Sequence, residues 1–320
     1  MNILYYGACW PTNIGNAFID YGSMYTIKAA APGARVFMAS ELPRWLYKLH
    51  EIDMDASIDL AELIEVDFVV VSGMNLCDEF IEVEGPVIEK LSRRGVKIIL
   101  NGCGGASYTS QEIENFKNFL GSVNVVGFIS RDEASFLNYK DCFTKSFNGI
   151  DCAFFLPQAF IPAPLRIKDF IVFNFDSSEE PPAENPQRRI IRTKHSCDQI
   201  LVKPRRERAL RAGLKLMLNR SKNVKPLTGH KDTLVSDLPD DYINLYANTY
   251  ATYSDRVHAC LATLAFGNLA RLYSKSPRAA LFDRIGASAI TSELIKPDLD
   301  LISREKRNQI SMLKELLQKK

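Results

Sequence analysis

No apolar run in the sequence approaches the roughly 20 residues that a transmembrane helix needs. The first residues, Met1-Asn2-Ile3-Leu4, lack the basic start and the long apolar core of a secretory signal. These two absences predict a soluble, cytoplasmic protein. Any contact with a membrane would then be peripheral, at its inner face.

The cysteines and histidines are not spaced along the sequence as metal ligands or disulfide pairs usually are. The seven cysteines form no CxxC pair and are odd in number, which argues against a disulfide framework or a zinc site. Cys103 is the only candidate nucleophile, and a buried thiol is the favoured interpretation. Three of the four histidines, His50, His195 and His230, lack a motif and are interpreted as surface residues. No metal is predicted.

The sequence is nearly neutral overall, but its charges are segregated. The net charge is +2, whereas residues 41–89 hold 13 acidic and 2 basic side chains, and residues 188–225 hold 13 basic and 2 acidic ones. The basic segment lacks interleaved aromatics, which argues against nucleic acid. It suits an anionic acceptor, such as a diphosphate-linked sugar, or an anionic membrane face; a solvated helix face is the alternative.

Strand and helix patterns alternate along the first half of the chain. Apolar runs predict strands at residues 3–6, 36–39, 68–72, 96–100 and 126–130. Amphipathic patterns predict helices at residues 16–29, 58–64, 84–93, 110–120 and 131–139. This alternation is typical of a parallel sheet that binds ligands at the carboxyl ends of its strands.

The alternation stops at Pro157, Pro162 and Pro164 and then restarts. Further strands are predicted at residues 170–175, 224–227, 250–253 and 269–273, and helices at 204–218, 240–247 and 301–317. Since 320 residues are many for one core, we expect two Rossmann-like α/β domains facing across a cleft. Their predicted bounds are residues 1–165 and 166–286, followed by a C-terminal helical segment, 287–320.

The stretch from Ser254 to Gly267 is the most informative in the chain. Its apolar residues recur at helical spacing, Ser254 or Asp255 could cap the helix, and Gly267 could end it. Arg256 and His258 then lie at the helix start, where a phosphate or carboxylate is favoured. The pattern predicts an anion site with a proton donor. The alternative is that Arg256 merely pairs with Asp255 or another carboxylate.

Other polar or glycine-bearing loops also follow predicted strands. They are Asn13-Ile14-Gly15-Asn16, Ser72-Gly73-Met74-Asn75, Gly102-Cys103-Gly104-Gly105 and the start of a helix at Arg131. Asn16 could cap the first helix, and the glycine loop could form a nest of N–H groups for an oxyanion. The GxGG spacing does not fit a dinucleotide fingerprint. We expect these loops to converge on one crevice.

The segment Ser254-Asp255-Arg256-Val257-His258-Ala259, with its apolar helix and Gly267, resembles the C-terminal signature of the polysaccharide pyruvyl transferase family. The resemblance extends from about Met1 to about Gly286, because further pieces follow in the family's order: 13–16, 72–74, 102–105, 130–135 and 149–153. Two departures concern the acceptor half of the site. Members usually carry Asp where Asn16 stands, and a glycine triplet where Ser72-Gly73-Met74 stand.

The resemblance implies a glycosyltransferase-B-like fold and an enzyme that moves the pyruvyl group of phosphoenolpyruvate onto two sugar hydroxyls as a ketal. The acceptor would be a cell-surface glycan or its lipid-linked precursor, and phosphoenolpyruvate would be a co-substrate, with no cofactor. The catalytic residues would be His258 and Arg256, and the donor would be bound by Arg131, Arg256, His258 and Ser254. The acceptor side would comprise Asn13, Gly15, Asn16, Asn75, Gly104 and Gly105.

Two other interpretations remain open. The chain could be a nucleotide-sugar glycosyltransferase of the same architecture. It could also be a degenerate family member that only binds a glycan, since Asn16 and Met74 replace residues that members usually carry.

Overall fold

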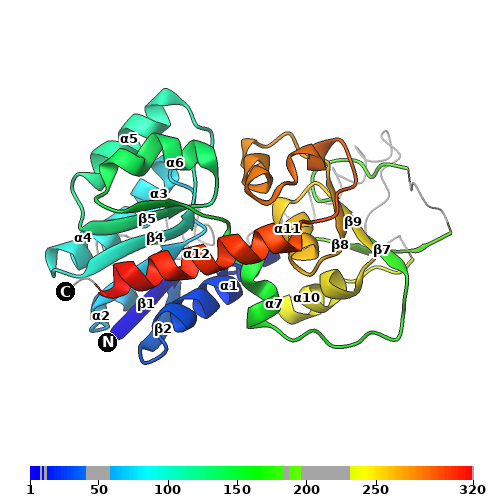
Figure 1. The fold of residues 1–320 in the computed structure, drawn as a ribbon, viewed down its shortest axis with the longest axis horizontal. Coiled ribbons are helices and arrows are strands. Elements are labelled where there is room, and N and C mark those ends of the chain that lie inside the picture. The colour runs from blue at the N-terminus through cyan, green and yellow to red at the C-terminus, as the bar shows by residue number, and fades with distance from the viewer. Residues whose placement is uncertain (8, 11–12, 41–57, 183–186, 196–230, 319–320) are drawn as a thin grey trace, which may run out of the picture.

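The computed structural model describes residues 1–7, 9–10, 13–40, 58–182, 187–195 and 231–318, and Figure 1 shows them as two lobes. The first lobe is built on a six-stranded parallel sheet in the order β2-β1-β3-β4-β5-β6. Its strands are β1 (Asn2–Gly7), β2 (Arg35–Ser40), β3 (Phe68–Ser72), β4 (Lys97–Cys103), β5 (Val125–Ser130) and β6 (Ser146–Asn148).

The second lobe holds a four-stranded parallel sheet in the order β10-β9-β7-β8. Its strands are β7 (Phe170–Asn174), β8 (Arg189–Thr193), β9 (Ala251–Ser254) and β10 (Leu269–Leu272). In each sheet the first strand pairs on both sides, so the strand order reverses there. Ligands of open α/β sheets bind outside the carboxyl ends of the strands at such a point, which here lies between β1 and β3 and between β7 and β9.

The strands form where the sequence is continuously apolar, as in β3 and β7, whose residues are all buried. The α-helices are α1 (Ile14–Ala30), α2 (Leu60–Leu63), α3 (Asp78–Val83), α4 (Gly85–Arg93), α5 (Ser110–Leu120), α6 (Glu133–Tyr139), α7 (Leu156–Ala159), α10 (Pro239–Asn248), α11 (Val257–Ala265) and α12 (Leu299–Gln318). Shorter 3-10 helices are η1 (Lys140–Cys142), η2 (Cys152–Phe155), η4 (Pro277–Ile285) and η5 (Ser288–Thr291).

Two helices belong to the cores of both lobes. On α1, Phe18 packs in the core that also contains residues of α10 and α11, while Ile27 packs on the first sheet. On α12, Ile302 joins the second-lobe core, and Leu313 and Leu316 pack beneath β1 and β3. Figure 1 shows α12 running across the molecule from one lobe to the other. These helices tie the lobes together.

The structure corrects several predicted boundaries. The first helix begins at Ile14 because Asn13, not Asn16, caps it by accepting a hydrogen bond from the N–H of Gly15. The helix predicted from Arg131 begins at Glu133, because Asp132 is its cap. The predictions missed β6 and β8; in β8 the exposed or half-exposed Arg189 and Arg192 hide the strand pattern within a run of charge.

Some predictions lie outside the described residues: the helix at 204–218, the strand at 224–227, and His50 and His230. No helix in the described ranges is long and apolar enough to cross a membrane. The six cysteines that the structure describes are unpaired. Cys103 is fully buried, and burial raises its pKa to about 12, so the interpretation of it as a core thiol is confirmed.

Candidate active site

The turn between β9 and α11 carries the signature residues. Arg256, not Ser254 or Asp255, is the N-cap residue of α11. The hydroxyl of Ser254 accepts from the N–H of Arg256 (2.8 Å) and donates to Asn174 Oδ1 (2.9 Å). Ser254, predicted to bind the donor substrate, therefore lies buried beneath the turn. The Asp255 carboxylate instead accepts the N–H groups of residues 176, 177 and 178. The prediction that Ser254 or Asp255 caps the helix is therefore wrong.

The side chain of Arg256 contacts a carboxylate that follows the neighbouring strand, β7. Its Nε lies 3.3 Å from Oδ2 of Asp176, which follows β7 and whose side chain is almost fully buried. The helix that Arg256 begins ends where predicted, at Gly267 with φ +86°. Because the first N–H groups of a helix have no intrahelical partner, the guanidinium stands beside an end that favours anions.

His258, in the first turn of α11, faces the first lobe. Its Nε2 lies 3.6 Å from Oδ2 of Asp151, a fully buried carboxylate whose Oδ1 accepts from the N–H of Ala153 (2.9 Å). At 3.6 Å the contact between Nε2 and Oδ2 is an ion-pair contact and not a hydrogen bond, and neither atom has a hydrogen-bond partner in the described part of the chain. Burial alone would raise the pKa of Asp151, but His258, Arg131 and the Ala153 N–H together hold it below its ordinary value.

Gly15 brings the first predicted loop against the same histidine. A Cβ on Gly15 would lie 3.0 Å from the Cβ of His258 and 3.3 Å from its Nδ1. Glycine therefore allows the start of α1 to approach the imidazole closely. Asn13 and Asn16 lie at the same helix start, where Asn13 Nδ2 donates to Asn16 Oδ1 (3.2 Å).

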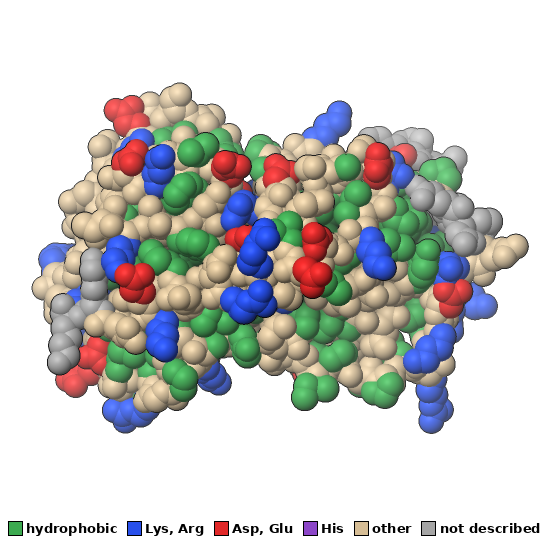
Figure 2. Space-filling view, viewed as in Figure 1, with side chains coloured by type: hydrophobic (Ala, Val, Ile, Leu, Met, Phe, Trp, Pro, Cys, Tyr) green, Lys and Arg blue, Asp and Glu red, His purple; other side chains and the backbone are tan. Residues whose placement is uncertain are grey.

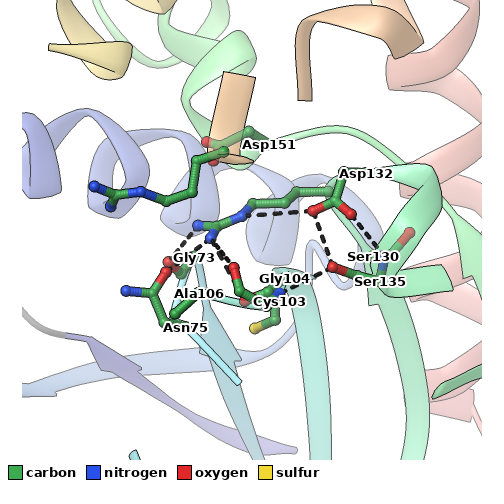
Figure 3. A network of polar contacts seen from close by, with 12 residues as sticks. Gly73, Asn75, Cys103, Gly104, Ala106, Ser130, Asp132, Ser135 and Asp151 are labelled. Atoms are coloured by element: carbon green, nitrogen blue, oxygen red, sulfur yellow. Dashed lines mark hydrogen bonds and ion pairs between the residues drawn. The ribbon is translucent and has the colours of Figure 1, made fainter. Parts of the chain in front are cut away.

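Arg131 lies buried at the carboxyl end of β5, 2% exposed, and clamps the ends of β3 and β4. It donates to the carbonyl of Gly73 (3.1 Å), to Asn75 Oδ1 (2.8 Å) and, at longer range, to the carbonyls of Gly104 and Gly105. Figure 3 shows this network with Asp151 above it. Most of its donors are thus used within the protein, and it brings positive charge toward Asp151.

The predicted nest at the glycine loop is wrong. The N–H of Gly104 donates to the carbonyl of Met74 (3.2 Å), and that of Gly105 donates to Ser135 Oγ (2.9 Å). A nest does form one turn later, where the N–H groups of residues 106, 107 and 108 converge, but the carboxylate of Glu112 fills it. The carboxylate of Glu112 therefore holds this loop in place.

Tyr108 borders the site in a strained conformation. Its φ is +58°, which is unfavourable for a bulky side chain. Its hydroxyl donates to Asp132 Oδ2 (2.9 Å). Burial, followed by the charge of Asp132, raises its pKa to about 12, so the phenol stays protonated. It interacts electrostatically with Arg131 and with Arg278, a residue of η4.

Sequence reasoning missed Arg278. Burial, followed by the positive charges of Arg131 and Arg256, lowers its pKa. Its side chain donates to Ser276 Oγ (3.4 Å), and no ion pair is found for it among the described residues. Three guanidinium groups thus lie in one electrostatic environment, from which we expect strong attraction for a multiply charged anion. Only proximity in the fold reveals this, since Arg278 has no local motif.

The interpretation of His195 as a surface residue is wrong. It is 1% exposed, its Nε2 lies 2.6 Å from the hydroxyl of Tyr246, and its carbonyl accepts from the N–H of Ile14 (3.1 Å). Burial, then the charges of Arg256 and His258, lowers its pKa well below the ordinary value, so it is neutral. On the face that Figure 2 draws, no described side chain has the colour of histidine.

The arrangement of the two lobes has counterparts among solved structures. MnaA of S. aureus, solved with UDP, has a TM-score of 0.55 at 12% identity, covering 98% of this chain and 91% of its own. A putative UDP-N-acetylglucosamine 2-epimerase of Listeria monocytogenes has a TM-score of 0.54 at 11% sequence identity, and the match covers 98% of this chain and 90% of that protein. The UDP-GlcNAc 2-epimerase of Neisseria meningitidis has a TM-score of 0.51 at 12% sequence identity, and the match covers 98% of this chain and 94% of that protein.

These similarities show a two-domain α/β fold of glycosyltransferase-B-like architecture, so the predicted fold class is confirmed. A family model for polysaccharide pyruvyl transferase matches residues 13–267. The chain belongs to the polysaccharide pyruvyl transferase family and is a transferase. No curated protein matches it.

Proposed function

We propose that this transferase moves the pyruvyl group of phosphoenolpyruvate onto two hydroxyls of a sugar, forming a ketal. The observation that carries the proposal is that His258, Arg131 and Arg278 interact with the buried carboxylate of Asp151, and that Arg256 lies close enough to Arg278 to interact with it. Phosphoenolpyruvate has both a phosphate and a carboxylate. It also needs a proton at its CH2 carbon, which an imidazolium can supply.

Arg256 and Arg278 are the candidates to hold the two anionic groups of the donor, because both residues are partly exposed, Arg256 begins α11, and Arg278 interacts with Arg256. Arg131 contributes positive charge to the site, while its guanidinium N–H groups donate to carbonyls at the ends of β3 and β4. Since the site is partly desolvated, these charges act more strongly than they would in water. They would stabilise the negative charge that builds on the departing phosphate.

In the chemical step, His258 gives a proton to the CH2 carbon, and the neighbouring carbon becomes electrophilic. One sugar hydroxyl attacks that carbon and returns its proton to His258. The bond to the phosphate oxygen then breaks with its electron pair, and the second hydroxyl closes the ring. Its proton goes to the phosphate, so protons and electrons balance and no cofactor takes part.

The acceptor on this proposal is a sugar of a surface glycan or of its lipid-linked precursor. Gly15 lies against His258 and Asn75 against Arg131, so the first-lobe loops would border the acceptor hydroxyls. Asn13, Asn16, Gly104 and Gly105 are the other residues of this side. A lipid-linked acceptor would bring the protein from the cytoplasm to the inner face of the membrane.

The test is phosphate release from phosphoenolpyruvate with a panel of sugar and lipid-linked acceptors, for the wild type and for His258→Ala. We expect the variant to lose turnover by about 100-fold or more, the usual contribution of a general acid. Arg304→Ala, exposed on α12, is the matched control and should leave turnover unchanged. Unchanged turnover in His258→Ala would rule out the assigned proton donor.

A thermal-shift comparison separates the alternatives. Phosphoenolpyruvate should raise the melting temperature of the wild type, and less so that of Arg278→Ala. MnaA of S. aureus was solved with UDP and the epimerase of Neisseria meningitidis with UDP-GlcNAc, so UDP-sugars are the competing ligands. Stabilisation by a UDP-sugar alone would favour a glycosyltransferase. Binding of phosphoenolpyruvate without phosphate release for any acceptor would favour a glycan-binding member.

A further inference from the structure

Each of the two signature side chains of α11 meets a buried carboxylate from a different lobe. Asp151, in the first lobe, contacts His258 across the lobe boundary, and Asp176, which follows β7, contacts Arg256. Asp151 is fully buried and the side chain of Asp176 is 3% exposed. Carboxylates so deeply buried require fixed partners, so each contact is a constraint on the residue that it meets.

The loop that carries Asp151 is held rigidly by side chains from the C-terminal part of the chain. Oε1 of Gln309, on α12, accepts from the N–H of Ile150 (2.8 Å). Arg284, on η4, donates to the carbonyls of Asn148 (2.8 Å) and Gly149 (3.4 Å). Asp151 is therefore a fixed point against which an imidazole can be aligned.

Asp176 is fixed differently. Its Oδ1 accepts from the N–H of His195 (3.3 Å), the residue whose carbonyl caps the start of α1, while its Oδ2 faces Arg256. The carboxylate thus sets the direction of the guanidinium from within the second lobe.

We infer that Asp151 and Asp176 are positioning residues with separate tasks. Asp151 turns His258 so that Nε2 points inward and Nδ1 is the nitrogen that transfers the proton, whereas Asp176 aims Arg256 at the anionic donor. The catalytic part of this inference rests on the proposed function. The orientation of the imidazole does not, because it follows from the contact between Nε2 and Asp151.

The chemical reason lies in the two ring nitrogens. A carboxylate at Nε2 stabilises a proton there, so the neutral imidazole carries its lone pair on Nδ1, which faces Gly15 at the start of α1. The groups that face this pair are the charged Arg131 and Arg278 toward Asp151, and the neutral imidazole of His195 toward His258. The two arginines favour the ionised form of Asp151.

The two tasks predict opposite kinetic signatures. Asp151→Asn keeps the shape and an acceptor oxygen but removes the charge that stabilises the imidazolium, so kcat should fall by about 100-fold while the KM for phosphoenolpyruvate changes little. Asp176→Asn should raise that KM by about 10-fold or more and leave kcat within about 3-fold. Asp237→Asn, at an exposed position, is the control and should match the wild type.

Nitrogen NMR of histidine-labelled protein tests the orientation without any turnover. In the neutral form, His258 of the wild type should show the Nε2–H tautomer, and Asp176→Asn should keep it, whereas Asp151→Asn should lose this preference. An Nδ1–H tautomer in the wild type would overturn the inference even if no variant folded. Equal kinetic effects of the two substitutions would overturn the division of tasks. Failure of phosphoenolpyruvate as a substrate would instead refute the proposed function and leave the tautomer result to decide the orientation.

Discussion

At the scale of single residues, Lys306 is a buried cation, and no carboxylate of the described residues lies within ion-pair distance of it. Its side chain is 8% exposed, and its Nζ donates to Gln158 Oε1 (2.9 Å) and lies 5.7 Å from the ring centre of Phe155. Burial lowers its pKa from its ordinary value to about 8. The folded protein therefore binds this proton less tightly than the unfolded chain does.

Lys306→Met should raise the free energy of unfolding by about 1–3 kcal/mol at pH 7, because the cost of burying a cation is removed. Between about pH 8 and 10 the unfolded chain holds more protons than the folded one, so the wild type gains stability as pH rises and the difference should shrink. Urea denaturation at pH 7 and pH 10 measures this. An equal gain at both values would show that packing, not charge, is responsible.

At the scale of elements, α1 approaches η2 so closely that a glycine is required between them. Gly22 lies in the middle of α1, where a glycine ordinarily weakens a helix by about 1 kcal/mol relative to alanine. A Cβ at this position would overlap the backbone carbonyl oxygen of Cys152. Tertiary packing thus outweighs helix propensity at Gly22.

Gly22→Ala should destabilise the protein by about 3 kcal/mol or more, because backbone, unlike a flexible side chain, cannot move aside easily. Gly33→Ala is the matched control: no atom lies within 4 Å of its added Cβ, and its effect should stay within about 0.5 kcal/mol. Thermal unfolding of both variants compares them. A stabilising Gly22→Ala would mean that α1 and η2 lie further apart than described.

The loop before α5 depends on a single carboxylate. Burial would raise the pKa of Glu112, but its hydrogen bonds to Ser107, Tyr108 and Ala106 outweigh burial and lower it. The stabilisation is therefore complete above about pH 4.3, the ordinary value for Glu, and is lost as pH falls through the lower folded value.

Glu112→Gln should cost about 1.5–3 kcal/mol at pH 7, the range for hydrogen bonds to a charged group, and much less near pH 3, where the wild type has lost the same contribution. Glu114→Gln, exposed on the same helix, should show no such pH dependence. Denaturant titrations at both pH values measure the difference. A cost that does not depend on pH would contradict the role of the charge.

At the scale of the whole molecule, α1 and α12 contribute to both cores, so we expect the lobes to unfold together. Leu316 of α12 is fully buried on the first sheet, where a Cβ on Gly127 would overlap it. Leu316→Ala should lower stability by about 2–4 kcal/mol. Calorimetry should show one transition that moves as a unit. Two separate transitions, with only the first shifted, would show that the lobes are independent.

The face drawn in Figure 2 has both signs of charge interspersed, with basic side chains gathered near its middle. The basic segment 188–225 falls mostly outside the described residues, so its action on an acceptor stays a prediction.

The sequence alone determined the alternation of strands and helices, the family and the position of Arg256 and His258 at a helix start. These features depend on local signals: apolar periodicity, glycine at a helix end and a contiguous motif. The same local signals failed for β8, whose two arginines hide its strand pattern, and for His195, whose burial depends on Tyr246 and α1.

Only the tertiary structure decided which groups meet at the site. Asp151 faces His258 from the other lobe, and Arg278 comes near Arg131 and Arg256 through η4. Arg131 is used largely on the carbonyls at the ends of β3 and β4. Such partners are set by how α1 and α12 pack the two sheets together, and that packing depends on contacts between residues far apart in the sequence, which no local pattern encodes.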